Sequence, residues 1–232
     1  MPEPIAYRIR RSERVRRVRV AVDLERGVEV VLPMRTPERA AAAAVAELRP
    51  WIERRLEELA AVRGRLAERA GWVPYLDERL TLVEEAGRSR VHRRGQQLLV
   101  PAGVADQRAG LERWYRRAAR DEVARRLDAA TGQAGLRYTS LAIRGQRTRW
   151  ASCAADGSMS FNWRLLLAPE RVLEYVVWHE VCHLEVANHS PGFWALVERR
   201  CPGWREPAAW LRENGRDLVL VAQPLPGAGA PA

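Results

Sequence analysis

The residues best suited to chemistry in this chain lie between positions 179 and 189. Three of the four histidines fall there, in the run His-Glu-Val-Cys-His-Leu-Glu-Val-Ala-Asn-His, whose first five residues match H-E-x-x-H. Residues four apart on a helix differ by about 40° around its axis, so His179 and His183 point the same way and can bind one zinc ion. Glu180, beside them, is the candidate general base that takes a proton from a zinc-bound water.

The third candidate ligand, His189, requires the helix to end before it. Because it follows His183 by six residues, a continuing helix would turn it about 240° away from the other two rings. Asn188 tolerates a left-handed backbone, and Ser190-Pro191 is typical of the start of a new helix, so the sequence predicts the necessary break. The spacing equals that of the metzincins, although Val186 stands in place of their turn glycine.

Cysteines are not expected to bind the metal. Cys182 lies inside the motif, but it points about 60° from His179 on the side away from His183, which favours a packed core residue. The three cysteines, Cys153, Cys182 and Cys201, do not form a C-x-x-C pair, so neither a thiolate zinc site nor a disulfide framework is indicated.

The elements that must position these residues follow from periodicity. Apolar residues at helical spacing after Pro169 predict a long helix that carries His179 and His183. Two short strands are expected before it, around 139–143 and 159–163, with a hairpin turn at Asp156-Gly157. The other predicted elements are strands within 7–22, 28–32, 80–83 and 97–100, and helices from 36, from 50 to about 68, from about 111 to 130, after Ser190, and up to Asn214-Gly215.

Composition and charge restrict the surroundings and partners. The chain has 232 residues, 47% of them hydrophobic, which is enough for a sizeable core. It shows neither a secretory leader nor a run of about 18 apolar residues, so we expect a cytoplasmic protein that does not enter a membrane. The net charge of +10, carried by arginine without any lysine, favours affinity for polyanions such as nucleic acid.

Several further segments accompany the histidine motif. They are Arg149-Trp-Ala-Ser-Cys153, Asn162-Trp-Arg-Leu165, Leu167-Ala-Pro169, Tyr175 to Trp178, Asn188-His-Ser190, Phe193-Trp194 and Trp210-Leu211, with Tyr7–Ser12 and Val28–Pro33 near the N-terminus. Together these segments resemble the YgjP-like family of metal-dependent hydrolases, relatives of the SprT and WLM metallopeptidases, over almost the whole chain. The resemblance implies zinc bound by His179, His183 and His189, Glu180 as the base, and a hairpin at 149–153 that borders the substrate cleft. Ala151 replaces the glycine usual in that hairpin.

The expected fold class is α+β. A zincin-like catalytic region over 106–222, with a small antiparallel sheet packed on the active-site helix, is expected to follow an N-terminal strand and helix region over 1–105. The tail over 223–232, rich in Pro, Gly and Ala, is expected to be disordered. Whether the two regions form one unit or two stays open, as does the oligomeric state.

The function favoured by these residues is a metallopeptidase with one zinc ion, acting on a peptide or protein. In this reading the metal polarises the scissile carbonyl, and Arg149 or Ser152 steadies the substrate.

Two alternatives remain open. A nucleotide phosphoanhydride hydrolase is suggested by four arginines that can hold phosphates near the site, Arg144, Arg147, Arg149 and Arg164. Against it, such enzymes commonly use magnesium held by carboxylates, whereas three histidines suit zinc. A nucleic-acid-binding protein with a structural zinc is suggested by the arginines at 8, 10, 11, 14, 16, 17 and 19, but structural zinc sites usually have four protein ligands.

Overall fold

The computed structural model describes residues 4–23, 27–67, 69–104, 106–146 and 149–220, and the predicted disordered tail therefore lies outside the described residues. The fold is a mixed α+β arrangement of small sheets and helices, as predicted. Contacts divide the chain into two compact units, Met1–Glu68 and Arg69–Ala232, and each has its own hydrophobic core.

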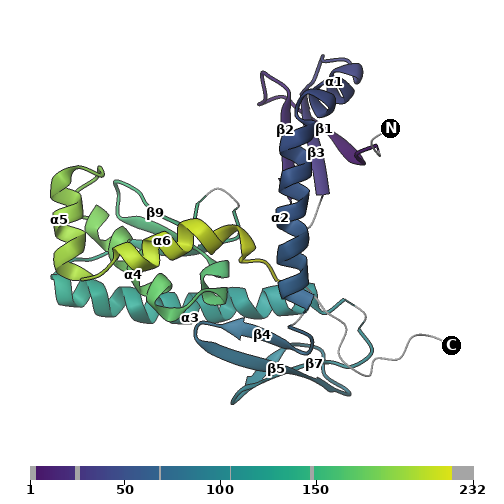
Figure 1. Cartoon of the computed structure of the whole chain (residues 1–232). Coiled ribbons are helices and arrows are strands. Elements are labelled where there is room, and N and C mark those ends of the chain that lie inside the picture. Colours follow the sequence, from purple (N-terminus) through teal and green to yellow (C-terminus); the bar gives the residue numbers. More distant parts are fainter. Residues whose placement is uncertain (1–3, 24–26, 68, 105, 147–148, 221–232) are drawn as a thin grey trace. The chain divides into compact units, whose positions relative to one another are not determined.

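The first unit is a three-stranded sheet with two helices (Figure 1). The central strand β3 has Val28, Val30 and Leu32 on one face, as the period of two in a strand requires, and all three are buried with Ala41 and Ile52. The strand order is β1-β3-β2, with β1 parallel and β2 antiparallel to β3. The elements are β1 (Tyr7–Ser12), β2 (Arg19–Asp23), β3 (Gly27–Pro33), α1 (Arg39–Glu47) and α2 (Arg49–Ala67).

The second unit begins with a four-stranded sheet that packs on the long helix α3 (Arg108–Ala134). Its strands, in the order β4-β5-β7-β6, are β4 (Trp72–Tyr75), β5 (Glu78–Glu85), β7 (Gln97–Pro101) and β6 (His92–Arg94). Figure 1 shows α3 running along this sheet. The buried Tyr115 of α3 donates its hydroxyl hydrogen to the carbonyl of Pro74, which joins helix and sheet. Helix α3 is longer than predicted and ends before Gly135, whose φ of 69° suits glycine.

A second small sheet and three helices complete this unit. They are β8 (Ser140–Arg144), β9 (Ala151–Cys153), β10 (Ser158–Asn162), the short 3-10 helix η1 (Trp163–Leu167), α4 (Glu170–His183), α5 (Pro191–Arg200), α6 (Arg205–Asn214) and η2 (Gly215–Asp217). The predicted turn at Asp156-Gly157 is confirmed, but it joins β9 to β10 rather than the two strands expected from the sequence.

The prediction of an antiparallel sheet was wrong, because β8 pairs parallel with β10 and only β9 is antiparallel to it. Strand β10 lies between β8 and β9 in this sheet. A three-residue strand such as β9 is too short for a reliable alternation pattern, which explains why the sequence did not reveal it.

The two compact units divide the chain after Glu68, whereas the sequence analysis placed a division after residue 105. The reason lies in the core: Val73, Leu80 and Leu98 of the four-stranded sheet are buried in the same cluster as Leu111 and Val176. None of the described helices is both long enough and apolar enough to cross a membrane.

Candidate metal centre

Helix α4 supplies the first part of the site. Its apolar residues Val172, Leu173 and Val176 are buried in the core of the second unit, which fixes the rotation of the helix about its axis. His179 and His183 then lie one turn apart, half-buried, with ring centroids separated by 5.0 Å. The helical prediction for these two residues is confirmed.

The chain turns sharply after His183, as His189 requires. Helix α4 ends at His183, and the amide of Val186 donates to the carbonyl of Cys182. The Asn188 side chain then accepts from the amide of Ser190 at 3.1 Å, just before Pro191 starts α5. Asn188 does not adopt the left-handed conformation that we expected, since Leu76 is the one non-glycine residue with positive φ in the described chain. Its side chain makes the turn instead of its backbone dihedral.

The three imidazoles converge on one point. One nitrogen from each of His179, His183 and His189 lies within 4.8 Å of the others, and the Nε2 atoms of His179 and His189 are 3.0 Å apart. Two nitrogens bound to one tetrahedral zinc at 2.0–2.1 Å would be roughly 3.3 Å apart. The donor set therefore fits a zinc ion after small adjustments of the rings.

Hydrogen bonds orient two of these rings. The Nδ1 of His183 is 3.1 Å from the carbonyl oxygen of Val186, so Nδ1 carries the hydrogen and Nε2 keeps a lone pair. The Nδ1 of His179 is 3.4 Å from the hydroxyl of Tyr175, one turn earlier on α4. Both contacts direct the other ring nitrogen toward the centre of the cluster.

The surroundings favour the neutral form of the His179 and His183 imidazoles by lowering the pKa of each. Burial, together with the neighbouring His183 and His189, lowers the pKa of His179 to about 4. Burial also lowers the pKa of His183, although its bond to the Val186 carbonyl opposes the shift. A neutral imidazole is the form that can donate a lone pair to a metal.

Glu180 lies beside the cluster and is 5% exposed. Burial raises the pKa of this carboxyl to about 7, against the lowering effect of a hydrogen bond from the backbone amide of Cys153. Its Oε2 is buried without a hydrogen-bond partner among the described residues. A buried carboxylate oxygen without a partner is costly, and such groups are frequent at catalytic sites.

Strand β9 forms the free edge of its sheet next to Glu180. The amide of Asn162 donates to Trp150 and that of Ala154 donates to Ser158, so the alternation of an antiparallel pair also joins Ser152 to Ser160. The intervening residues Ala151 and Cys153 therefore direct their backbone groups away from β10, toward the site. An edge strand of this kind can pair with an extended chain.

The other predicted site residues are placed differently. The Ser152 hydroxyl is 2.9 Å from that of Ser160, on the face of the sheet opposite to Cys153. Arg149 is exposed just before β9, and its guanidinium has no partner among the described residues. The Arg164 guanidinium lies 4.6 Å over the Trp163 ring and donates to the Gly145 carbonyl, while Arg147 lies outside the described residues.

Cys182 is fully buried in the core and is not among the grouped ligand atoms, as expected for a packing residue.

Aromatic rings pack around the histidines, and the sequence did not predict them as part of the site. Phe193 stacks on His183 at 4.5 Å between ring centroids, and Trp194 stacks on His189 at 5.6 Å. Trp204 in turn stacks on Trp194 at 4.5 Å. The run Phe193-Trp194, directly after the third histidine, was the available signal, but spacing alone does not show which face of α5 meets the rings.

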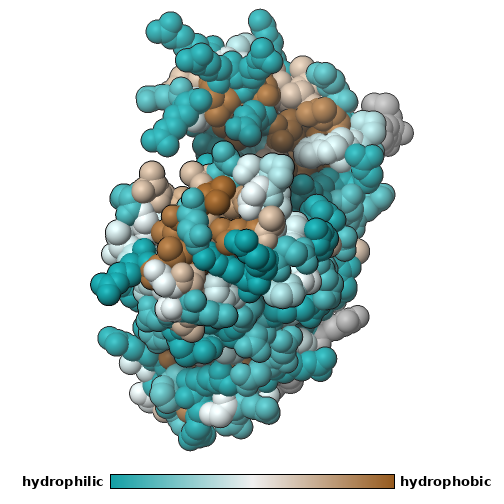
Figure 2. All heavy atoms as spheres, turned by 90° about the vertical axis from the view of Figure 1, so that its left-hand side faces the viewer, coloured by the Kyte–Doolittle hydropathy of each residue, from teal (hydrophilic) through white to brown (hydrophobic). Residues whose placement is uncertain are grey.

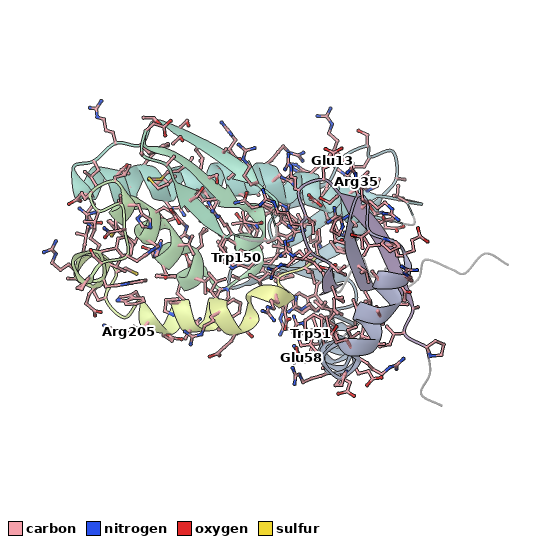
Figure 3. All side chains as sticks on the ribbon, turned by 90° about the horizontal axis from the view of Figure 1, so that it is seen from above. Glu13, Arg35, Trp51, Glu58, Trp150 and Arg205 are labelled. Atoms are coloured by element: carbon pink, nitrogen blue, oxygen red, sulfur yellow. The ribbon has the colours of Figure 1, made fainter. Side chains whose placement is uncertain are left out.

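Other features border this region. Helix α6 begins at Arg205 (Figure 3). At the other end of this helix, Gly215 packs against the ring of Trp150. On the α5 side of the second unit, apolar surface is exposed among polar residues (Figure 2).

Two comparisons with known proteins give a match. A family model described as "YgjP-like, metallopeptidase domain" matches residues 16–214. A crystal structure of the metallopeptidase zymogen of Pyrococcus abyssi abylysin is similar at 26% sequence identity, covering 42% of this chain and 99% of its own, with a TM-score of 0.36. Among curated proteins, none matches the chain.

Proposed function

The chain belongs to the YgjP-like metallopeptidase family, and from this we propose that it is a peptidase with one zinc ion, bound by His179, His183 and His189. Glu180 is the catalytic base in this proposal. The observation that carries it is the buried carboxylate of Glu180, with a free Oε2, beside three converging imidazole nitrogens.

The donor set supports zinc as the metal. Three imidazoles with no carboxylate among the grouped atoms suit zinc better than magnesium or calcium, which prefer oxygen ligands. Three protein ligands also leave a position for water, as catalytic zinc sites require, whereas structural sites usually have four. When bound, zinc supplies Lewis acidity toward a carbonyl oxygen and lowers the pKa of a coordinated water.

Glu180 moves the proton in this mechanism. Its raised pKa, about 7, places the carboxyl near the value at which a group can both accept and return a proton at neutral pH. Oε2 accepts the proton of the attacking water, and the same oxygen then gives it to the leaving amine. The bond from the Cys153 amide holds the carboxyl group in position while Oε2 acts.

The substrate class follows from strand β9. We propose that an extended peptide pairs with the outward backbone groups of Ala151 and with the carbonyl of Cys153, whose amide already donates to Glu180, which brings the scissile bond toward Glu180. Arg149, at the start of this edge, is proposed to contact the substrate. The proposed role of Ser152 is indirect, since its hydroxyl hydrogen bond with Ser160 steadies the strand. The region around this site, within residues 106–222, is proposed to be zincin-like.

The test compares the wild type with Glu180→Gln in metal content and in cleavage of a peptide pool. This change keeps the three histidines and removes the base, so we expect about one zinc in both proteins and a kcat lower by about 10²- to 10⁴-fold in the variant. Glu213→Gln, a change at an exposed carboxylate of α6, is the matched control and should leave kcat unchanged.

Two results would count against the proposal. Wild type that takes up no zinc from metal-replete buffer removes the metal site. The second result is that the wild type binds zinc and hydrolyses a nucleoside triphosphate but cleaves none of the peptides. The metal site would then stand, with phosphoanhydrides as its substrates.

A further inference from the structure

The second unit contains a cluster of arginines that is separate from the metal site. The run Arg88-Ser-Arg-Val-His-Arg-Arg94, which connects β5 to β6 and includes β6, has four arginines and no carboxylate. Across from it, helix α3 carries Arg113 and Arg117, which lie four residues apart and therefore on one face.

The two groups of arginines line a hollow of about 510 Å³. Arg88 and Arg90 come from the strand connection, and Arg113 and Arg117 from the helix. This hollow shares Arg88, Ser89 and Arg90 with a neighbouring one of about 310 Å³, and it shares Val91 and Arg117 with another of about 460 Å³. Through these shared residues the three hollows are neighbours and form a groove along the strand connection, and the two larger hollows also border α3.

The arginines that line this groove outnumber its carboxylates, which are Glu85, Asp106, Asp121 and Glu122. Glu122 is paired with Arg125 and Arg126. Arg90, Arg113 and Arg117 are exposed and have no ion pair within the described part of the chain. Arg88 is paired with Glu85, and the carboxylate of Asp106 accepts the backbone amide of Arg108 at 2.9 Å. Unpaired cations gathered around a concave surface create a positive potential that attracts an anion.

The rest of the lining adds a close approach between helix and strand connection, and an aromatic ring. Gly110 of α3 lies close to Val91, because a Cβ placed there would be 3.3 Å from the Val91 side chain. In the hollow of about 460 Å³, the half-buried ring of Tyr75 adds aromatic surface near Arg117, while Trp114 is only 8% exposed. Guanidinium groups beside aromatic surface are the combination by which proteins bind single strands, through phosphates and stacked bases.

We propose that this groove binds the phosphate backbone of a single-stranded nucleic acid. Its three neighbouring hollows, lined by arginines from two elements, suit successive phosphates along a strand better than the single phosphate group of a free nucleotide. Arg90, Arg113 and Arg117 each contact a phosphate through the guanidinium, whose planar fork matches phosphate oxygens. This inference is independent of the proposed peptidase activity, because none of these residues lies at the histidine cluster.

The test measures binding of the full-length protein to a fluorescent DNA strand of about twenty nucleotides, by anisotropy, at several salt concentrations. Each phosphate contact with a single strand contributes about 0.7 to the slope of log K against log salt, so R90Q/R113Q/R117Q should reduce the slope by roughly 2. Near 0.1 M salt the affinity should fall by roughly 100-fold.

The matched control is R14Q/R16Q/R17Q, which removes the same charge from exposed arginines of the β1–β2 connection. It should change the affinity by less than about threefold, since these three arginines do not line the groove and contacts with phosphates carry the affinity. Thermal melting and zinc content show that both variants are folded.

The proposal would be overturned if the wild type did not bind the strand, or if R90Q/R113Q/R117Q bound it as tightly as the wild type. It would also be overturned if R14Q/R16Q/R17Q lost as much affinity as the groove variant. A nucleoside triphosphate that displaces the strand with the strand's own affinity would also overturn it, in favour of a nucleotide site.

Discussion

Contacts of the individual rings, with a backbone carbonyl or with other rings, orient the candidate ligands. His183 is fixed by the Val186 carbonyl, while His189, which is exposed and outside any helix, depends on the stacked ring of Trp194. Trp194 itself is supported by Trp204, at 4.5 Å between ring centroids. The third ligand is therefore positioned by aromatic packing rather than by regular secondary structure.

Trp194→Ala is expected to weaken zinc binding, because His189 loses the ring that limits its rotation. Loss of a group that orients a ligand typically costs 10- to 100-fold in metal affinity, so we expect the zinc Kd to rise by at least about tenfold. Chelator competition measures this change directly. Trp194→Phe should retain most of the affinity, and Trp51→Ala, at a 37%-exposed tryptophan of α2, is the matched control. An unchanged Kd in Trp194→Ala would show that stacking does not position His189.

Short elements, rather than long ones, bring the substrate-facing groups to the site. The turn at 154–157 lets β9 pair with β10 as an antiparallel neighbour, and this pairing holds β9 in place beside Glu180. Gly157 has a φ of 78°, and its amide donates to the carbonyl of Ala154 at 2.9 Å. Glycine is needed there because a side chain strains a backbone in this region.

Gly157→Ala is therefore expected to lower the free energy of unfolding by about 1 kcal/mol. Gly132→Ala is the matched control, since Gly132 lies inside α3 with open space around its Cβ position. That change should raise the free energy of unfolding by roughly 0.5–1 kcal/mol, given the better helix propensity of alanine. Urea denaturation distinguishes the two, and a neutral Gly157→Ala would contradict the strained-turn argument.

Helices α3 and α4 are joined by a charged cluster around the buried Arg126. Its guanidinium donates to Glu122 of α3 at 2.8 Å, to Glu174 of α4 at 2.9 Å, and also to Glu170. Burial raises the pKa of Glu122, but hydrogen bonds from Arg125 and Arg126 outweigh it, so the pKa is below the ordinary value of 4.5.

The stabilisation from Glu122 consequently depends on pH. The pKa of Glu122 is lower in the folded protein than in the unfolded chain, where it is 4.5. The carboxylate therefore contributes its full stabilisation of the fold at pH values above 4.5. That contribution is lost as the pH falls through the pKa of the folded state. We expect Glu122→Gln to be less stable than wild type at neutral pH and to lose less stability between about pH 5 and pH 3. Melting temperatures across this range measure the difference, and parallel curves would contradict the prediction.

At the scale of the whole molecule, the site and its supporting core lie within one compact unit. All three histidines, Glu180, the aromatic rings and strand β9 belong to Arg69–Ala232. The four-stranded sheet belongs to the same unit, because its apolar face shares the core of α3 and α4. The first unit, Met1–Glu68, has a separate core built on β3.

A fragment that begins at Arg69 should thus fold and bind about one zinc ion, because it keeps the complete donor set and its core. A fragment that begins at residue 106 should fail to fold cooperatively, since it exposes the core positions that the sheet covers. Cooperative thermal melting and zinc content of both fragments provide the measurement. A well-folded fragment from 106 would show instead that the sheet is dispensable.

The sequence by itself determined the features that depend on local spacing. The H-E-x-x-H pattern placed His179 and His183 on one helical face, Ser190-Pro191 marked the next helix, and the fold class followed from alternating elements. Only the tertiary structure decided the parallel pairing of β8 with β10, the edge position of β9, the stacking of Trp194 on His189 and the extent of the second core. Those features depend on contacts between residues far apart in the chain or on ring orientation, and neither leaves a periodic pattern in the sequence.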